Sequence, residues 1–183
     1  MNQIDMGKSY GRAARKVASG LLIALATLAV SGIASAQNYR QPTLAKFRGG
    51  IGVDPVSNIS TTGTVTLNIV RGVSPGSPWR IADLDAIVRS DGRISVVGRG
   101  LLLANGNGIG TNANQSVHAS LFCGAAATAT EHTTNVAGVA LEADGDFVIN
   151  DFLSPAPPAT CTTPVLLIRN VGGVWFAAGI PKH

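Results

Sequence analysis

One short stretch decides the fold of this chain: residues 87–97 have the sequence Ile-Val-Arg-Ser-Asp-Gly-Arg-Ile-Ser-Val-Val. Runs rich in β-branched residues flank a central Asp-Gly pair, and side chains that branch at Cβ favour extended strands. Asp91 and Gly92 tolerate the positive φ angles that the central residues of a type I′ turn require. The stretch therefore predicts a β-hairpin, in which residues 87–89 pair antiparallel with residues 94–97.

Two further Gly-containing turns repeat this arrangement. Each lies between two apolar runs: Asp144-Gly145 between residues 139–141 and 147–149, and Gly172-Gly173 between residues 165–168 and 174–176. Three hairpins predict six antiparallel strands. Apolar residues at alternate positions predict further strands over residues 46–53, 64–70 and 116–123.

The number of strands and the composition indicate the fold class. Eight or nine short strands, with 22 glycines in the chain and few helical patterns, predict an all-β fold. An antiparallel two-sheet sandwich and a small barrel both fit this pattern. Residues 37–183 form a segment of the length of one domain, which is long enough to bury a single core.

The first 36 residues have the order of a cleavable secretory signal peptide. Four basic residues precede an apolar run from about residue 20 to residue 30, and Ala34-Ser35-Ala36 follows it. Small residues at these positions are typical of a signal-peptidase site. The mature protein is therefore expected to begin at Gln37 and to be periplasmic or secreted.

Removal of residues 1–36 changes the charge of the protein. Four of the 14 Lys and Arg residues and one of the 10 Asp and Glu residues lie in that segment, which leaves a net charge of about +1. This balance gives no basic surface for nucleic acid. The apolar run is shorter than the ~20 residues of a membrane-spanning helix, so no membrane span is expected after cleavage.

Two cysteines, Cys123 and Cys161, lie in the mature part of the chain. An oxidising compartment favours a disulfide between them, and their spacing is not that of a redox Cys-x-x-Cys pair. The Pro-rich run 154–161 is expected to be an extended crossing that the disulfide holds in place. This run, residues 54–63 and the Gly- and Asn-rich run 105–112 are three candidate binding loops.

No recognisable catalytic, cofactor or metal motif stands out in residues 37–183. The chain lacks the Gly-x-Ser-x-Gly turn of serine hydrolases. Alternate carboxylates in the turn at residues 142–146 have the start of a calcium loop but not its later ligands, and a hairpin turn explains them equally. The remaining candidate ligands, His118 and His132, do not complete a zinc set with Glu131. We therefore expect neither a metal nor a cofactor.

Several segments together resemble an uncharacterised family of exported bacterial β-sandwich proteins. They are residues 117–126, 145–147, 153–158, 161, 164–169 and 175–181. The chain is also similar to the chordin-type (CHRD) β-sandwich domain, whose His-x-His-Cys-Gly strand falls on residues 120–124, Ser-Leu-Phe-Cys-Gly. Both histidines of that motif are absent here. The resemblance thus implies a sandwich and no metal or ligand site.

These observations predict a non-enzymatic binding or structural module of the bacterial cell envelope, with an envelope or extracellular partner whose identity is unknown. The alternative is an extracytoplasmic enzyme with a site assembled from distant strands. Asp83, Asp85 and Arg99 are its candidate residues, because the two carboxylates occupy alternate positions on one strand face.

Overall fold

The computed structural model describes residues 41–182, so the predicted signal peptide, residues 1–36, lies outside the described residues. The described part is all-β, with one short 3₁₀ helix, η1 (Gly106–Gly108). Its strands are β1 (Thr43–Gly52), β2 (Val56–Ile59), β3 (Val65–Leu67), β4 (Trp79–Arg80), β5 (Asp83–Arg89), β6 (Arg93–Arg99), β7 (Leu102–Leu103), β8 (Ser116–Cys123), β9 (Thr130–Thr133), β10 (Val139–Ala140), β11 (Phe147–Phe152), β12 (Val165–Asn170) and β13 (Trp175–Lys182). Within residues 41–182, no helix is long and apolar enough to cross a membrane.

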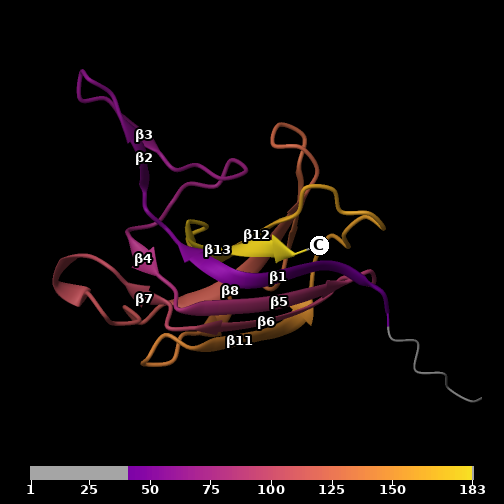
Figure 1. The fold of residues 1–183 in the computed structure, drawn as a ribbon. Coiled ribbons are helices and arrows are strands. Elements are labelled where there is room, and N and C mark those ends of the chain that lie inside the picture. The colour runs from indigo at the N-terminus through magenta and orange to yellow at the C-terminus, as the bar shows by residue number, and fades with distance from the viewer. Residues whose placement is uncertain (1–40, 183) are drawn as a thin grey trace, which may run out of the picture. The chain divides into compact units, whose positions relative to one another are not determined.

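Nine of the strands form one antiparallel sheet (Figure 1). Its order is β10-β8-β12-β13-β1-β5-β6-β11, and β9 pairs with β8 beside β10. The pairs β2-β3 and β4-β7 form two small separate sheets. The sheet curls until its two ends approach each other, so of the two all-β alternatives the nearly closed, barrel-like one is formed.

The three predicted turns form, but their type differs from the prediction. Each closes with a hydrogen bond from the Gly N–H to the carbonyl oxygen three residues earlier: Gly92 to Arg89, Gly145 to Glu142, and Gly173 to Asn170. In each turn only the glycine that donates this bond has a positive φ, which is +85° at Gly92, Gly145 and Gly173. A tight turn followed by a left-handed glycine is the three-residue hairpin loop with a bulge, not the two-residue type I′ turn.

The predicted hairpin around Asp144-Gly145 is wrong in its strand pairing. The turn is present, and Glu142 N–H donates to Asp146 O at 2.9 Å. However, β10 pairs with β8 and β11 pairs with β6, so the two strands lie at opposite ends of the sheet order. We call this junction between β10 and β11 the seam. A reciprocal backbone bridge between Thr133 and Ser154 closes its other end.

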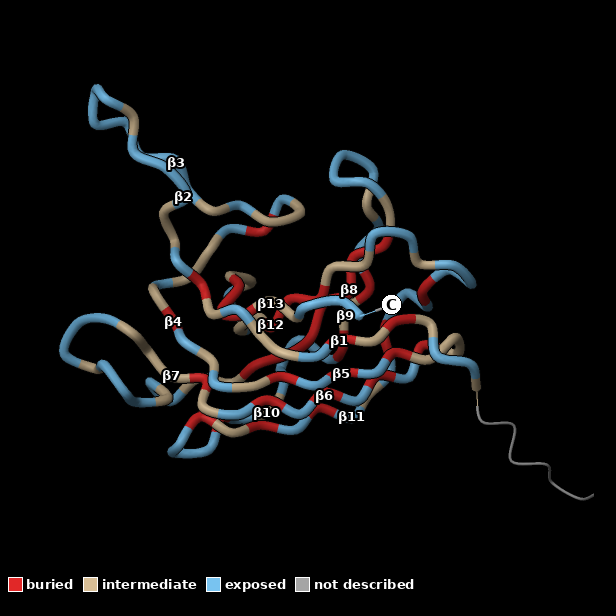
Figure 2. The backbone as a smooth tube through the Cα atoms, viewed as in Figure 1, coloured by how far each residue is buried: buried red, intermediate tan, exposed pale blue. Residues whose placement is uncertain are grey.

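The core lies on the inner face of the sheet (Figure 2). Residues of β5 and β6 alternate between buried and exposed, as the pattern of residues 87–97 predicts. Strand β8 differs, because residues 117–123 are all buried and so both of its faces are covered. Trp79 stacks on Phe176 with ring centroids 4.2 Å apart, and both side chains are buried.

The strand predicted over residues 64–70 is shorter than expected and is not part of the large sheet. Only Val65–Leu67 is extended, paired with β2 in a hairpin that leads away from the sheet (Figure 1). We call residues 56–69 the arm. Its large apolar side chains Ile59, Val65, Leu67 and Ile69 are exposed. The alternating pattern of residues 64–70 predicts a strand with one buried face, yet no other described part of the chain covers the apolar face of the arm.

We expect Gly145→Ala to destabilise the protein much more than Gly110→Ala. Both glycines have positive φ, +85° and +81°, which costs an L residue about 1 kcal/mol. A Cβ at Gly145 would also lie 2.5 Å from the carbonyl oxygen of Leu101, whereas Gly110 has open space. The clash should lower the free energy of unfolding by about a further 1–3 kcal/mol. Urea unfolding measures both losses, and equal losses would contradict the packing of the turn against Leu101.

Candidate functional site

The outer face of β5, β6 and β11 carries large apolar side chains that water reaches. Ile87, Val97, Val148 and Phe152 are 37%, 39%, 53% and 57% exposed. Strand pairing places Val97 opposite Val148 and Phe152 opposite Arg93. These side chains occupy outward positions, where a sheet with one wet face ordinarily has polar residues. A cluster of this kind marks a contact surface.

The same face contains a groove of about 640 Å³. It is lined by Ile87, Arg89, Arg93, Ile94, Ser95, Asn150, Asp151 and Phe152. A smaller hollow of about 280 Å³ adjoins it, shares Ile87 and Ser95 with it, and extends across β5 to Lys46, Arg48 and Asp85 on β1 and β5. We call the two together the outer-face groove. The larger volume lies within the ~300–1,000 Å³ range of ligand sites.

The polar groups of the outer-face groove are held in place by neighbours. Ser95 Oγ donates to Asn150 Oδ1 at 2.7 Å. Arg93 Nε donates to Asp91 Oδ2 at 2.9 Å, and its guanidinium lies 5.8 Å from the ring centroid of Phe152. An aromatic ring beside a fixed cation and an amide offers an apolar surface with hydrogen-bonding groups at its border. This arrangement suits the binding of a partly apolar partner.

A second polar cluster, partly buried, lies on β8, β9 and β12. Arg169 Nη1 donates to Ser120 Oγ at 3.1 Å and also to Glu131 Oε1. Ser120 Oγ lies 3.1 Å from Glu131 Oε1, to which it can donate its own proton. Arg169 Nε donates to Gly173 O at 3.0 Å, which ties the cluster to the β12-β13 turn. Since the serine hydroxyl is fully buried and occupied by these partners, the cluster holds three strands together.

His118 lies beside this cluster, opposite Arg169 in the β8-β12 register. Its side chain is buried, and Nδ1 has no hydrogen-bond partner among the described residues. Burial lowers the pKa of His118 below its ordinary value, and the positive charge of Arg169 lowers it further, whereas Glu131 opposes the shift. His118 is therefore favoured as a neutral imidazole in the folded protein.

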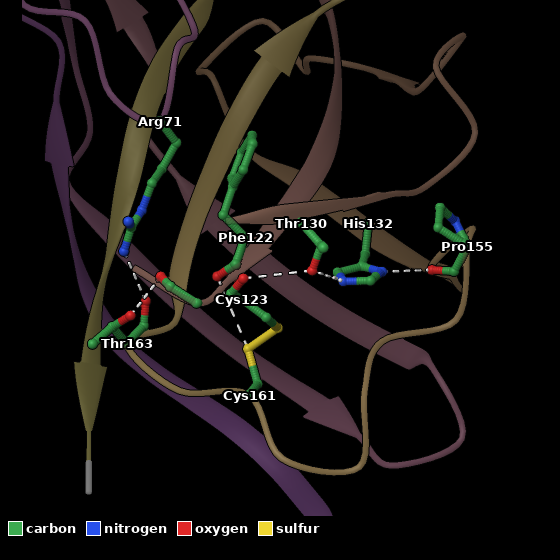
Figure 3. The surroundings of a disulfide bond; sticks show 9 residues. Arg71, Phe122, Cys123, Thr130, His132, Pro155, Cys161 and Thr163 are labelled. Atoms are coloured by element: carbon green, nitrogen blue, oxygen red, sulfur yellow. Dashed lines mark hydrogen bonds between the residues drawn. A yellow bond between two sulfur atoms is a disulfide. The ribbon is translucent and has the colours of Figure 1, made fainter. Parts of the chain in front are cut away.

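The disulfide between Cys123 and Cys161 is present, as predicted (Figure 3). It joins the end of β8 to the Pro-rich run 154–161. Thr163 reinforces this junction, because its Oγ1 donates to Gly124 O at 2.6 Å and its carbonyl oxygen accepts from Arg71 Nη2 at 3.0 Å. The disulfide therefore lies at a point where three segments distant in sequence meet.

His132 lies close to the disulfide (Figure 3) and fixes the start of the Pro-rich run. Its Nδ1 lies 2.8 Å from Pro155 O, and since a carbonyl only accepts, Nδ1 carries a proton. In the neutral ring, Nε2 then accepts from the Thr130 hydroxyl at 3.0 Å. Glu131, the preceding residue, points to the opposite face of β9 toward Arg169. This is why Glu131 and His132 do not converge on one site.

The three residues of the enzyme alternative lie on one outer face, as the spacing of Asp83 and Asp85 predicted for these two carboxylates. Asp83 lies opposite Arg99, and its Oδ1 accepts from Leu84 N–H at 2.9 Å. Asp85 lies 3.7 Å from Arg48, with both side chains about 60% exposed. An ion pair this exposed contributes little. Only Asp85 borders the outer-face groove.

The remaining candidate residues have structural contacts. In the turn at residues 142–146, Asp144 Oδ1 accepts from Asp146 N–H at 3.1 Å and Asp146 Oδ1 accepts from Gly100 N–H at 2.9 Å. Asn112, in the Gly- and Asn-rich run, donates through Nδ2 to the carbonyl oxygens of Leu141 and Glu142. Among residues 41–182, no three His, Cys, Asp or Glu side chains are grouped to hold a metal.

Comparison of the chain with protein-family models, with curated proteins and with solved structures gave no match. Its function must therefore be inferred from its own surfaces. The outer-face groove was missed at the sequence level, although a signal was present. In this hairpin the buried face is already supplied by the alternate residues, so the apolar residues Ile87 and Val97 fall on the outward face.

We expect replacement of both cysteines, Cys123→Ala with Cys161→Ala, to lower the free energy of unfolding by about 3–4 kcal/mol. The bond closes a loop of 38 residues and so restricts the unfolded chain. Denaturant unfolding of the oxidised protein and of the variant measures the difference. Reductant should bring the natural protein down to the stability of the variant and leave the variant unchanged. An unfolding free energy that changes neither with the double replacement nor with reductant would contradict a structural role for the disulfide.

We expect His118→Gln to reduce the acid sensitivity of the fold. The folded-state pKa of His118 lies below 6.5, the ordinary value, so the unfolded chain takes up the proton first as the pH falls. The stabilisation by neutral His118 is therefore complete above pH 6.5 and is lost as the pH falls toward the lowered pKa. Unfolding free energies at pH 7.5 and about pH 5.5 should differ more for the natural protein than for the variant. Parallel losses would count against this role for His118.

Proposed function

We propose that this protein is an exported binding or structural module of the bacterial cell envelope, and that it contacts its partner through the outer-face groove. The groove itself is the main support for this proposal. It combines accessible Ile87 and Phe152 side chains with fixed polar groups on a rigid sheet. Binding sites are commonly built in this way, because a pre-arranged surface loses little entropy on binding.

The proposal of export is supported by the sequence of residues 1–36 and by the disulfide. Disulfides persist mainly in oxidising compartments outside the cytoplasm. The resemblance to exported bacterial proteins supports the same location. A mature chain starting at Gln37 would carry the whole sheet, since β1 begins at Thr43.

The composition of the outer-face groove indicates the chemistry of its partner. Four basic residues, Lys46, Arg48, Arg89 and Arg93, and two acidic residues, Asp85 and Asp151, line it. Arg48 lies beside Asp85 and Arg93 is paired with Asp91, so the excess of positive charge is small. A partner with apolar groups and few charges suits it better than nucleic acid, whose binding depends on a basic surface. The partner is therefore expected to be a protein or another largely uncharged envelope component.

The test uses cells that produce the full chain. N-terminal sequencing of the protein outside the cytoplasm should give Gln37 as the first residue. The purified protein should co-sediment with the envelope fraction, and Ile87→Ser with Phe152→Ser should weaken this binding about tenfold or more, because it removes the apolar part of the groove. Val171→Ser is the matched control, since Val171 is 71% exposed but lies in the β12-β13 turn. Retention of an intact Met1 chain, or equal binding by all three proteins, would contradict the proposal.

A further inference from the structure

The arm, residues 56–69, has one continuous apolar face. Val56 lies opposite Leu67, and Ile59 lies opposite Val65, in the β2-β3 register. Residues opposite each other in an antiparallel pair project to the same side, so these four side chains share a face. Ile59, Val65 and Leu67 are 62%, 51% and 48% exposed. The arm is thus a small amphipathic sheet with its apolar side in water.

The base of the arm is anchored to the large sheet. Asn68 N–H donates to Pro55 O at 2.9 Å, and Asn68 Nδ2 donates to Asp54 O at 3.1 Å. The carbonyl oxygen of Asn68 accepts from Nε1 of the buried Trp175 at 3.1 Å. The first two bonds close the two ends of the arm on each other, and the Trp175 bond ties this base to β13, while the apolar face of the arm stays uncovered. A two-stranded hairpin alone is marginally stable in water and normally packs against another surface.

Charge indicates what covers the arm. Residues 55–70 contain no charged side chain, so the arm attracts neither a polyanion nor a charged membrane surface. On the outer-face groove, Arg93 is already paired with Asp91, and Arg48 lies beside Asp85. An uncharged segment of a partner would leave these ion pairs intact and would contact the apolar side chains between them. The arm of a second copy has this character.

Size also favours a reciprocal arrangement. A stable interface involves roughly 20–30 residues on each side. The arm, residues 56–69, and the lining of the outer-face groove each offer about half of that number. If each copy laid its arm on the groove of the other, both surfaces would be used on both sides. Such a contact is two-fold symmetric and closes as a dimer, and it packs two sheets face to face.

We propose that the arm of one copy binds the outer-face groove of a second copy, and that this exchange forms a symmetric dimer. The inference rests on the proposed function in using the same groove, and it names a second copy of this chain as the partner. Val65 and Leu67 would contact Val97, which lines the smaller hollow of the groove, and Val148, which lies opposite Val97 on β11.

The first experiment measures self-association of the purified protein by sedimentation equilibrium, with no envelope present. The arm variant is Val65→Thr with Leu67→Thr, and the groove variant is Val97→Thr with Val148→Thr. All four positions are exposed and threonine favours strands, so the folds should be retained, as circular dichroism and melting can verify. Both variants should raise the dimer dissociation constant about tenfold or more. Val171→Thr should leave it unchanged.

The second experiment mixes the arm variant with the groove variant. A heterodimer has one intact contact, between the natural arm of one partner and the natural groove of the other. Its second contact carries both changes, whose effects overlap because the residues touch. The mixture should therefore associate more tightly than either variant alone.

Three results would overturn the proposal. The natural protein could remain a monomer at about 100 µM, a concentration at which even weak dimers with micromolar dissociation constants form. The arm variant alone could weaken association, which would mean that arms pair with arms. Both variants could dimerise like the natural protein. If any of these occurred while envelope binding still depended on Ile87 and Phe152, the proposed function would stand and only the self-association would be wrong.

Discussion

The seam of the barrel is closed by a turn instead of a ladder of hydrogen bonds, and the start of β11 on the outer face depends on that turn. Gly145 lies against the backbone of Leu101, and the Asp146 carboxylate accepts from Gly100 N–H. These contacts fix the start of β11 beside the end of β6. From there a ladder of six residue pairs holds β11 on β6 and places Asn150 and Phe152 in the outer-face groove. The Thr133-Ser154 bridge fixes the opposite end of the seam.

Local features of the fold could be predicted from the sequence, whereas features that depend on distant segments could not. The hairpin at residues 87–97 and the strand at residues 116–123 follow from alternation and from a Gly turn, and both form as expected. The disulfide follows from having two cysteines in a predicted exported chain. The hairpin at Asp144-Gly145 fails because the same turn can join two neighbouring strands or the two ends of one curled sheet. Local sequence does not distinguish these cases.

The candidate surfaces were missed for a related reason. An alternating strand pattern states that one face is apolar, but not which molecule covers it. In residues 64–69 the alternation is regular, yet Val65 and Leu67 remain exposed because the hairpin leaves the large sheet. The spacing of Asp83 and Asp85 did predict a shared face. It could not show that the smaller hollow reaches Asp85 and that the larger one lies further along, beside Phe152.

The two sides of the barrel differ in what covers their outer faces. On β8 and β12, the disulfide, the Arg169 cluster and the Arg71-Thr163 hydrogen bond bring loops over the sheet, and residues of both faces are buried. On β5, β6 and β11, no loop of the described chain has this role, and the apolar side chains are in water. Covalent and polar cross-links therefore stabilise one half and leave the other half rigid but open. A protein that bound through its β8 side would have to break these links, whereas binding at the β11 side only displaces water.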